Sequence, residues 1–173
     1  VAERGRRTNR DAAPSPHEEP LFVADVMLGR LAKWLRIMGY DVLYDNTADD
    51  PELKRVAAAD RRVLLTRDLE IAETRLPVRV VVVVDEDVRA QLRQVAGEFG
   101  LDVDRPLFTR CVLCNAPLED VARSDVEGHV PPYVLETAER FARCPRCGKL
   151  YWPATHVSRA REWLREALSG DSS

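Results

Sequence analysis

The chain has 173 residues, of which 45% are hydrophobic, so it can bury one domain core with a small second unit and is not disordered throughout. Its net charge of −3 and pI near 5.7 do not indicate a general nucleic-acid binder. The valine run 80–84 is far too short to cross a membrane, and no signal-peptide pattern follows the first arginines, so we expect a cytoplasmic protein without a membrane partner.

Strand-like and helical patterns alternate four times after an arginine- and proline-rich segment at 1–20, where we expect a disordered tail. The expected strands are 21–24, 41–44, 62–66 and 78–84, and helical periodicity or start signals follow each of them, at 28–38, from Asp50 onward, at 69–75 and at 88–99. Such alternation indicates a parallel sheet with right-handed crossovers. The predicted fold class is therefore α/β, with this unit covering 21–104.

Two helix starts have recognisable capping residues. Asp50 suits the N-cap of the second helix, because Pro51 then takes the first helical position. Near the end of the chain, apolar residues at helical spacing predict an amphipathic closing helix over 158–173, with Ser158 as its N-cap and the last residues as a tail. Its apolar stripe needs a partner, so we expect it to pack back on the body.

Aspartates stand where the predicted strands end: Asp25, Asp45, Asp68 and Asp85. Because ligands of open α/β sheets bind beyond the carboxyl ends of the strands, these carboxylates would collect at one edge. Crowded carboxylates repel unless a cation neutralises them, and Mg²⁺ or Mn²⁺ prefers such oxygen ligands. For any single aspartate, however, a turn or a helix cap is the more common role.

Basic residues lie close to the first and third of these aspartates. Arg30 and Lys33 fall in the first helix, and Arg67 directly precedes Asp68. A solvated helix face is the ordinary explanation for the first two. Beside a metal site, all three would be placed to hold the backbone of a polyanion.

Four cysteines form two C-x-x-C pairs, Cys111 with Cys114 and Cys144 with Cys147. In a chain without an export signal this favours zinc over disulfides, and four thiolates make a closed, structural site. The 29-residue interval between the pairs is longer than usual and predicts an inserted loop or helix around 131–141. We assign 105–157 to a zinc ribbon.

Basic and aromatic residues interleave around the second cysteine pair. Arg143, Arg146 and Lys149 are followed by Tyr151 and Trp152, and then by a histidine, His156. This composition suits single-stranded RNA, which binds through phosphate contacts and base stacking. A small hydrophobic core under the zinc explains the tyrosine and tryptophan equally well, and His156 is an alternative ligand that four thiolates do not need.

Several of these segments together resemble a known family. The resemblance lies in the run 22–36 (FVADVMLGRLAKWLR), in GYDV at 39–42, in LLTRD at 64–68, and in CPRCG with YWP at 144–148 and 151–153. These residues are similar to the Mut-seven C-terminal RNase domain family, PIN-like nucleases with a C-terminal zinc ribbon. The resemblance covers about 21–156. It implies a PIN-like three-layer sandwich with a central parallel sheet, and metal-dependent cleavage of RNA.

Carried over by position, the resemblance makes Asp25 and Asp68 the best metal-binding carboxylates, Asp50 a third, and Asp45 a weaker member. The predicted function is a ribonuclease with Mg²⁺ or Mn²⁺ at this acidic site and structural Zn²⁺ in the ribbon. One alternative is a non-catalytic RNA- or ribosome-associated module, with the ribbon gripping RNA or a protein partner. A phosphoacceptor receiver-like domain is a remote alternative, because no lysine follows the last strand.

Overall fold

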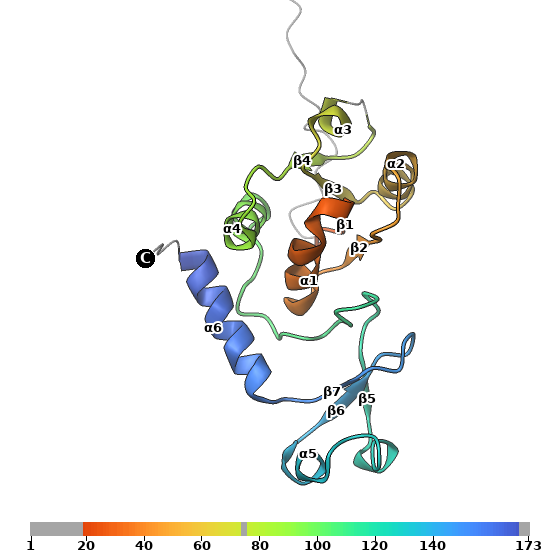
Figure 1. The fold of residues 1–173 in the computed structure, drawn as a ribbon, viewed down its shortest axis with the longest axis vertical. Helices are drawn as coiled ribbons and strands as arrows, with labels where there is room; N and C mark the ends of the chain where they lie inside the picture. Colours follow the sequence, from red (N-terminus) through yellow and green to blue (C-terminus); the bar gives the residue numbers. More distant parts are fainter. Residues whose placement is uncertain (1–18, 74–75, 170–173) are drawn as a thin grey trace, which may run out of the picture.

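The computed structural model describes residues 19–73 and 76–169; the tail expected at 1–20 lies outside them except for its last two residues. A parallel sheet in the order β2-β1-β3-β4 is followed by an antiparallel sheet in the order β5-β6-β7 (Figure 1). The strands are β1 (Phe22–Ala24), β2 (Val42–Tyr44), β3 (Val63–Thr66), β4 (Val80–Val82), β5 (Glu119–Val121), β6 (Phe141–Arg143) and β7 (Leu150–Tyr151). The helices are η1 (Val26–Leu28), α1 (Gly29–Ile37), α2 (Asp50–Ala59), α3 (Leu69–Glu73), α4 (Val88–Phe99), η2 (Arg123–Asp125), α5 (Pro132–Thr137) and α6 (Thr155–Ser169).

The parallel sheet is buried on both faces, which accounts for its nearly continuous apolar strands. Phe22 and Ala24 of β1 point into a core shared with α1, α4 and α6. Val23, between them, points into a second core shared with α2 and α3. Helices therefore cover both faces of the sheet, and the predicted α/β sandwich with a parallel sheet is confirmed.

Several predicted boundaries differ from the structure by one to three residues. The N-cap of α2 is Asp49 and not Asp50, because Asp49 has the extended backbone and its Oδ1 accepts the Glu52 amide at 2.9 Å. The closing helix starts at Thr155, whose carbonyl accepts the hydroxyl of Ser158, the predicted cap. β4 covers only 80–82 of the predicted 78–84, since its partner β3 ends at Thr66.

The closing helix packs back on the larger unit, as its apolar stripe predicted. Trp163 of α6 stacks on Trp34 of α1, with ring centroids 3.7 Å apart and an interplanar angle of 4°. Ala160 and Leu164 join the core beneath the sheet together with Leu107, which lies in the connector between α4 and the first cysteine pair (residues 100–110). Because connector and closing helix share one core with the sheet, the division at residues 104 and 157 stays a prediction.

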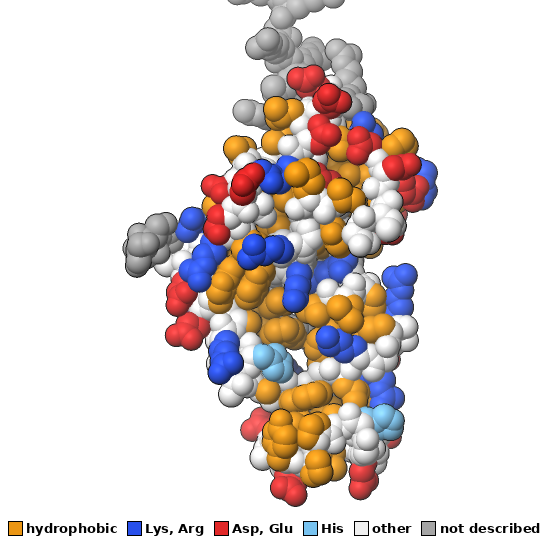
Figure 2. All heavy atoms as spheres, in the orientation of Figure 1, with side chains coloured by type: hydrophobic (Ala, Val, Ile, Leu, Met, Phe, Trp, Pro, Cys, Tyr) orange, Lys and Arg blue, Asp and Glu red, His pale blue; other side chains and the backbone are white. Residues whose placement is uncertain are grey.

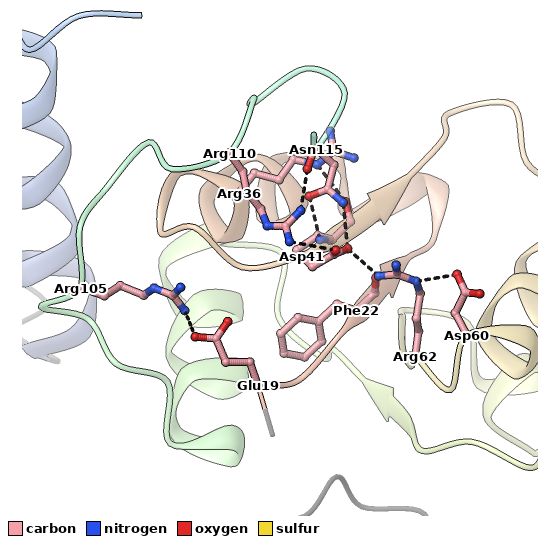
Figure 3. A network of polar contacts seen from close by, with 10 residues as sticks. Glu19, Phe22, Arg36, Asp41, Asp60, Arg62, Arg105, Arg110 and Asn115 are labelled. Carbon is pink, nitrogen blue, oxygen red and sulfur yellow. Dashed lines mark hydrogen bonds and ion pairs between the residues drawn. The ribbon is translucent and has the colours of Figure 1, made fainter. Parts of the chain in front are cut away.

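The ribbon is joined to the sheet through a buried polar network around Asp41 (Figure 3). The Asp41 carboxylate accepts from Arg62 at 2.6 Å and from the Asn115 amide at 2.9 Å, and it pairs with Arg110 at 3.1 Å. Asn115 Oδ1 also accepts the backbone N–H of Val42 on β2, at 3.0 Å. The first cysteine turn is therefore fixed against the edge strand of the parallel sheet.

Arg36 of α1 makes a second connection to the ribbon. Its guanidinium is buried and donates to three carbonyls. The distance is 2.9 Å to Val42, 3.3 Å to Val112 and 2.9 Å to Leu113. Two of these carbonyls lie between Cys111 and Cys114. Burial lowers the pKa of Arg36, and the three carbonyls accept from its Nε and Nη1 atoms.

Candidate active site and metal centre

The strand order brings the first and third strands together at the carboxyl edge of the sheet. β1 pairs with β3, whereas the chain runs from β1 to β2 on the other side, so the direction of winding reverses between β1 and β3. Ligand sites of open α/β sheets form at such a reversal. Asp25 directly follows β1, and Asp68 lies two residues beyond β3.

Asp25 is held in place by residues far from it in the chain. Its side chain is 5% exposed, and it is the only buried carboxylate among the described residues. Oδ2 accepts the Thr66 hydroxyl at 2.5 Å and the Arg67 amide at 2.9 Å, and Oδ1 accepts the Met27 amide at 2.6 Å. About four acceptor positions exist on a carboxylate, so roughly one, on Oδ1, is left for a ligand.

Thr66 connects Asp25 to the segment that carries Asp68. Its hydroxyl donates to Asp25 and accepts the Asp68 amide at 2.9 Å. The Asp68 carboxylate itself accepts the Glu70 amide at 2.7 Å, as a helix cap would. The two aspartates that match the family best are thus linked through one fully buried threonine.

The other candidate carboxylates are exposed, and the hydrogen bonds of Asp45 and Asp85 are local. Asp45 accepts the amide and the hydroxyl of Thr47, and these bonds lower the pKa of its carboxyl group. Asp50 is exposed on the first turn of α2, and Asp85 accepts the amide of Asp87 at 2.8 Å. No three carboxylates among the described residues bring their oxygens together as metal ligands do.

The basic candidates lie at the surface. Arg30 and Lys33 are exposed on α1. Arg67 is partly buried and pairs with exposed Glu86 at 3.3 Å. Figure 2 shows Asp and Glu side chains gathered over the end of the molecule with α2 and α3, and Lys and Arg side chains across its middle, between the sheet and the ribbon.

A cavity of about 520 Å³ lies between the edge strand β2, helix α2 and the cysteine turns. Asp45, Glu52 and Arg146 are among its lining residues, but Asp25 and Asp68 are not. Tyr44 separates the two places: it lines the cavity, and its hydroxyl donates to the Val26 carbonyl, next to Asp25, at 3.2 Å. Gly29 leaves room for this ring, since a Cβ there would lie 2.5 Å from the Tyr44 oxygen.

The four cysteine sulfurs converge, as their spacing predicted. All four lie within 4.8 Å of one another, with Cys114 and Cys144 3.3 Å apart. A residue with left-handed backbone follows each pair, Asn115 at φ 66° and Gly148 at φ 74°. Its amide donates a hydrogen bond to the carbonyl of the first cysteine of the pair. This four-cysteine cluster is compatible with tetrahedral zinc.

Neighbouring groups split the thiol pKa values. Burial raises the pKa of Cys111, but hydrogen bonds from the Tyr151 hydroxyl and from the Cys114 and Leu113 amides outweigh it and lower the pKa to about 6. Burial and the nearby Cys144 sulfur raise the pKa of Cys114 to about 12. Four sulfurs this close cannot all ionise on their own, whereas a bound Zn²⁺ favours four thiolates.

A protein-family model matches most of the chain. The model of the Mut7-C RNAse domain matches residues 20–164, which include both the sheet with Asp25 and the cysteine cluster. The chain belongs to the Mut7-C RNAse domain family. No curated protein and no solved structure matches it.

Membership in the Mut7-C family indicates a nuclease-type function with RNA as the substrate class. The described helices of this Mut7-C chain include none with the length and apolarity that a membrane crossing requires. The expectation of an insert between the cysteine pairs is also met, because α5 and η2 lie there.

Sequence reasoning missed three residues of this Mut7-C site. The sequence places Thr66 only at the end of a predicted strand, and its bond to Asp25 follows from the β1–β3 pairing. Asn115 and Tyr44 gave no signal, although Asn115 takes the position that glycine takes in the second pair. For Tyr151 the core interpretation holds: it is buried, and its hydroxyl donates to Cys111 Sγ at 3.2 Å.

Proposed function

We propose that this Mut7-C chain hydrolyses RNA phosphodiester bonds, with Asp25 as the principal carboxylate for Mg²⁺ or Mn²⁺ and Asp68 as the second. The observation that carries the proposal is the buried Asp25 carboxylate at the reversal of the sheet, held by Thr66 and Arg67. A protein buries a carboxylate only when it is hydrogen-bonded or paired, so its position is specified. Mg²⁺ commonly takes one or two carboxylates and completes its shell with water and phosphate oxygens.

The residues around Asp25 divide the remaining tasks. Bound there, a divalent ion would lower the pKa of a water and neutralise phosphate charge. Thr66 fixes the rotation of the Asp25 carboxylate, and Asp45 and Asp50 supply further negative charge at the rim. Arg30, Lys33 and Arg67 hold the RNA backbone, since phosphate contacts position a strand without reading its sequence. The cavity beside Asp45 gives the strand room.

The test compares two isosteric changes in zinc-loaded protein with Mn²⁺ and a single-stranded or structured RNA. Asp25→Asn should reduce the cleavage rate on the order of 100-fold or more, as removal of a group at the reacting centre does. Asp49→Asn, an equally small change at a helix cap, should leave the rate within about twofold because asparagine also caps helices. Equal rates for both variants would refute the proposal.

Thr66→Val separates positioning from ligation. It keeps the shape of the side chain but removes the hydroxyl that joins Asp25 to the Asp68 amide. We expect roughly a 10- to 100-fold higher Mn²⁺ concentration for half-maximal cleavage, as for other second-layer partners of metal ligands. An unchanged Mn²⁺ requirement would show that the hydroxyl serves only the fold.

The alternative is a non-catalytic RNA- or ribosome-associated binding module. It is favoured by the fact that Asp68 and Asp45 bind backbone amides and that no three carboxylates converge among the described residues. RNA binding that is independent of Mn²⁺, together with no Asp25-dependent cleavage, would select this alternative.

A further inference from the structure

A second cavity lies in the ribbon, away from the acidic edge of the sheet. Its volume is about 280 Å³, and it is enclosed by the connector around Phe108, by β6, and by the first turn of α6. None of the candidate carboxylates lines it. Pockets for drug-sized ligands start near this volume, so the cavity suits a single planar group.

Aromatic side chains form the walls of this ribbon pocket. Phe108, Trp152 and His156 line it, and the Phe108 ring meets the His156 ring edge-on with centroids 5.4 Å apart. Trp152 is only partly buried and packs with its protected side on the small core under α5. Phe108 and His156 thus support each other, Trp152 is supported by that core, and all three side chains line the cavity.

Phe108 takes its place at a conformational cost. Its φ of 55° lies in the left-handed region, which is unfavourable for a bulky residue. The conformation is held by its amide, which donates to the Ile37 carbonyl at the end of α1 at 2.8 Å. The ring is therefore fixed relative to the larger unit, and strain of this kind tends to collect at binding sites.

Polar groups of three kinds stand at the rim. Arg140 and His156 are exposed, and no hydrogen bond or ion pair of Arg140 is found within the described part of the chain. Asp120 on β5 is exposed as well and lines the same cavity. A guanidinium can meet a phosphate, and a carboxylate can accept from the exocyclic amine of a base.

We propose that the ribbon pocket binds one unpaired nucleobase of an RNA strand, stacked on Trp152 and His156 with Arg140 on the adjoining phosphate. The inference rests on the proposed function in taking RNA as the ligand. Single-stranded RNA is recognised in this way, through aromatic stacking beside basic groups. The band of Lys and Arg side chains across the middle of the molecule gives the strand a path from the ribbon toward the sheet (Figure 2).

The test measures binding without cleavage. The zinc-loaded chain of 173 residues, with no Mg²⁺ or Mn²⁺ added, is titrated into a short fluorescent single-stranded RNA, and fluorescence anisotropy gives Kd. His156→Ala and Trp152→Ala should each weaken binding roughly tenfold, the effect of losing one stacked base. His156→Tyr, which restores a stacking ring, should recover most of the affinity. Arg140→Glu should weaken binding, whereas Arg165→Glu on α6, the same change of charge outside the pocket, should not.

An abasic RNA series distinguishes stacking from damage to the fold. Removing one base from the RNA should weaken binding to the unmodified chain, but should weaken it no further in the double variant Trp152→Ala/His156→Ala, because both stacking partners are already gone. A photoreactive uridine at the sensitive position should cross-link to the peptide that carries Trp152 and His156. Full affinity of both alanine variants, or a cross-link confined to the sheet, would overturn the inference. Loss of binding to a proline-rich peptide in Trp152→Ala and His156→Ala, with RNA affinity unchanged, would overturn it in favour of protein docking.

The outcomes for the pocket and for the nuclease activity are separable. Base-dependent binding without any Asp25-dependent cleavage keeps the pocket and removes the nuclease. Cleavage with no loss of affinity in the pocket variants removes the pocket and keeps the nuclease.

Discussion

The two candidate metal centres of this protein differ in what their side chains contact. In the ribbon, four sulfurs from two tight turns face one point. At the sheet, Asp25 binds Thr66 of the neighbouring strand as well as the amide of Met27, whereas Asp45 and Asp68 accept only from groups within two residues of themselves. The four cysteines converge because two short turns place them. The aspartates follow different strands, so their convergence depends on the conformation of the chain after each strand.

The two sites therefore suit different roles, the cysteine cluster for stabilising the fold and the acidic edge for chemistry. Cysteine thiolates that surround a metal completely stabilise a fold and leave no position for a substrate. A site with one buried carboxylate and exposed neighbours has open positions for water and phosphate. The ribbon should therefore dominate stability measurements, and the acidic edge should dominate activity measurements.

The largest effect is expected from removing one cysteine. Cys144→Ser should abolish tight zinc binding and cost on the order of several kcal/mol of the free energy of unfolding, because ligand binding and ribbon folding are one process. Zinc content by mass spectrometry and urea denaturation measure it. Chelation of zinc from the unmodified chain should reproduce the loss, and a variant that keeps its zinc and its stability would contradict the ligand assignment.

Next in size is the loss of Arg36, which joins the two regions. Arg36→Met should cost about 2–4 kcal/mol of unfolding free energy, because the buried carbonyl of Val42 and the partly buried carbonyls of Val112 and Leu113 lose their donor. The matched control is Arg30→Met on the exposed side of the same helix, expected within ~0.5 kcal/mol. Urea denaturation compares them, and equal stabilities would show that the ribbon is anchored elsewhere.

A smaller, pH-dependent effect is expected at Asp41. Burial raises its pKa, but hydrogen bonds from Asn115 and Arg62 outweigh burial and lower the pKa below the ordinary value of 3.8. A depressed folded-state pKa stabilises the protein above that value, and the stabilisation is lost as pH falls through the folded pKa. Asp41→Asn should therefore cost about 1–2 kcal/mol near pH 7 and much less near pH 3. A pH-independent difference would contradict a role for the charge.

The smallest effect is expected at the exposed carboxylate beside the large cavity. Asp45→Asn should leave the urea midpoint unchanged and alter cleavage by no more than about threefold, because its contacts are local and solvated. Asp25→Asn is the matched comparison at the neighbouring strand. A loss of activity as large as that of Asp25→Asn would place Asp45 among the metal ligands. The carboxylates of the acidic edge would then converge on one metal, as the cysteine sulfurs of the ribbon do.

Sequence patterns predicted the parts of this molecule that depend on local spacing. The C-x-x-C pairs, the four strand–helix alternations and the returning stripe of α6 all follow from periodicity or short turns. Patterns failed where two neighbouring residues suit the same role. Asp49 and Asp50 are both good N-cap residues, and only the extended backbone of Asp49 identifies it as the cap of α2. Patterns also failed for Thr66 and Asn115, whose partners are set by strand order and by docking of the ribbon.

The contact between Asn115 and Val42 covers an edge of the parallel sheet that could otherwise pair with other chains. β2 is an edge strand, and edge strands with free amides and carbonyls recruit strands of other molecules. Here the Val42 amide is taken by Asn115 and its carbonyl by Arg36, so the first cysteine turn shields the border where foreign chains would add. If the first cysteine turn lost its structure in the absence of zinc, the Val42 amide would lose its partner and the edge of the parallel sheet would be open to pairing with other chains.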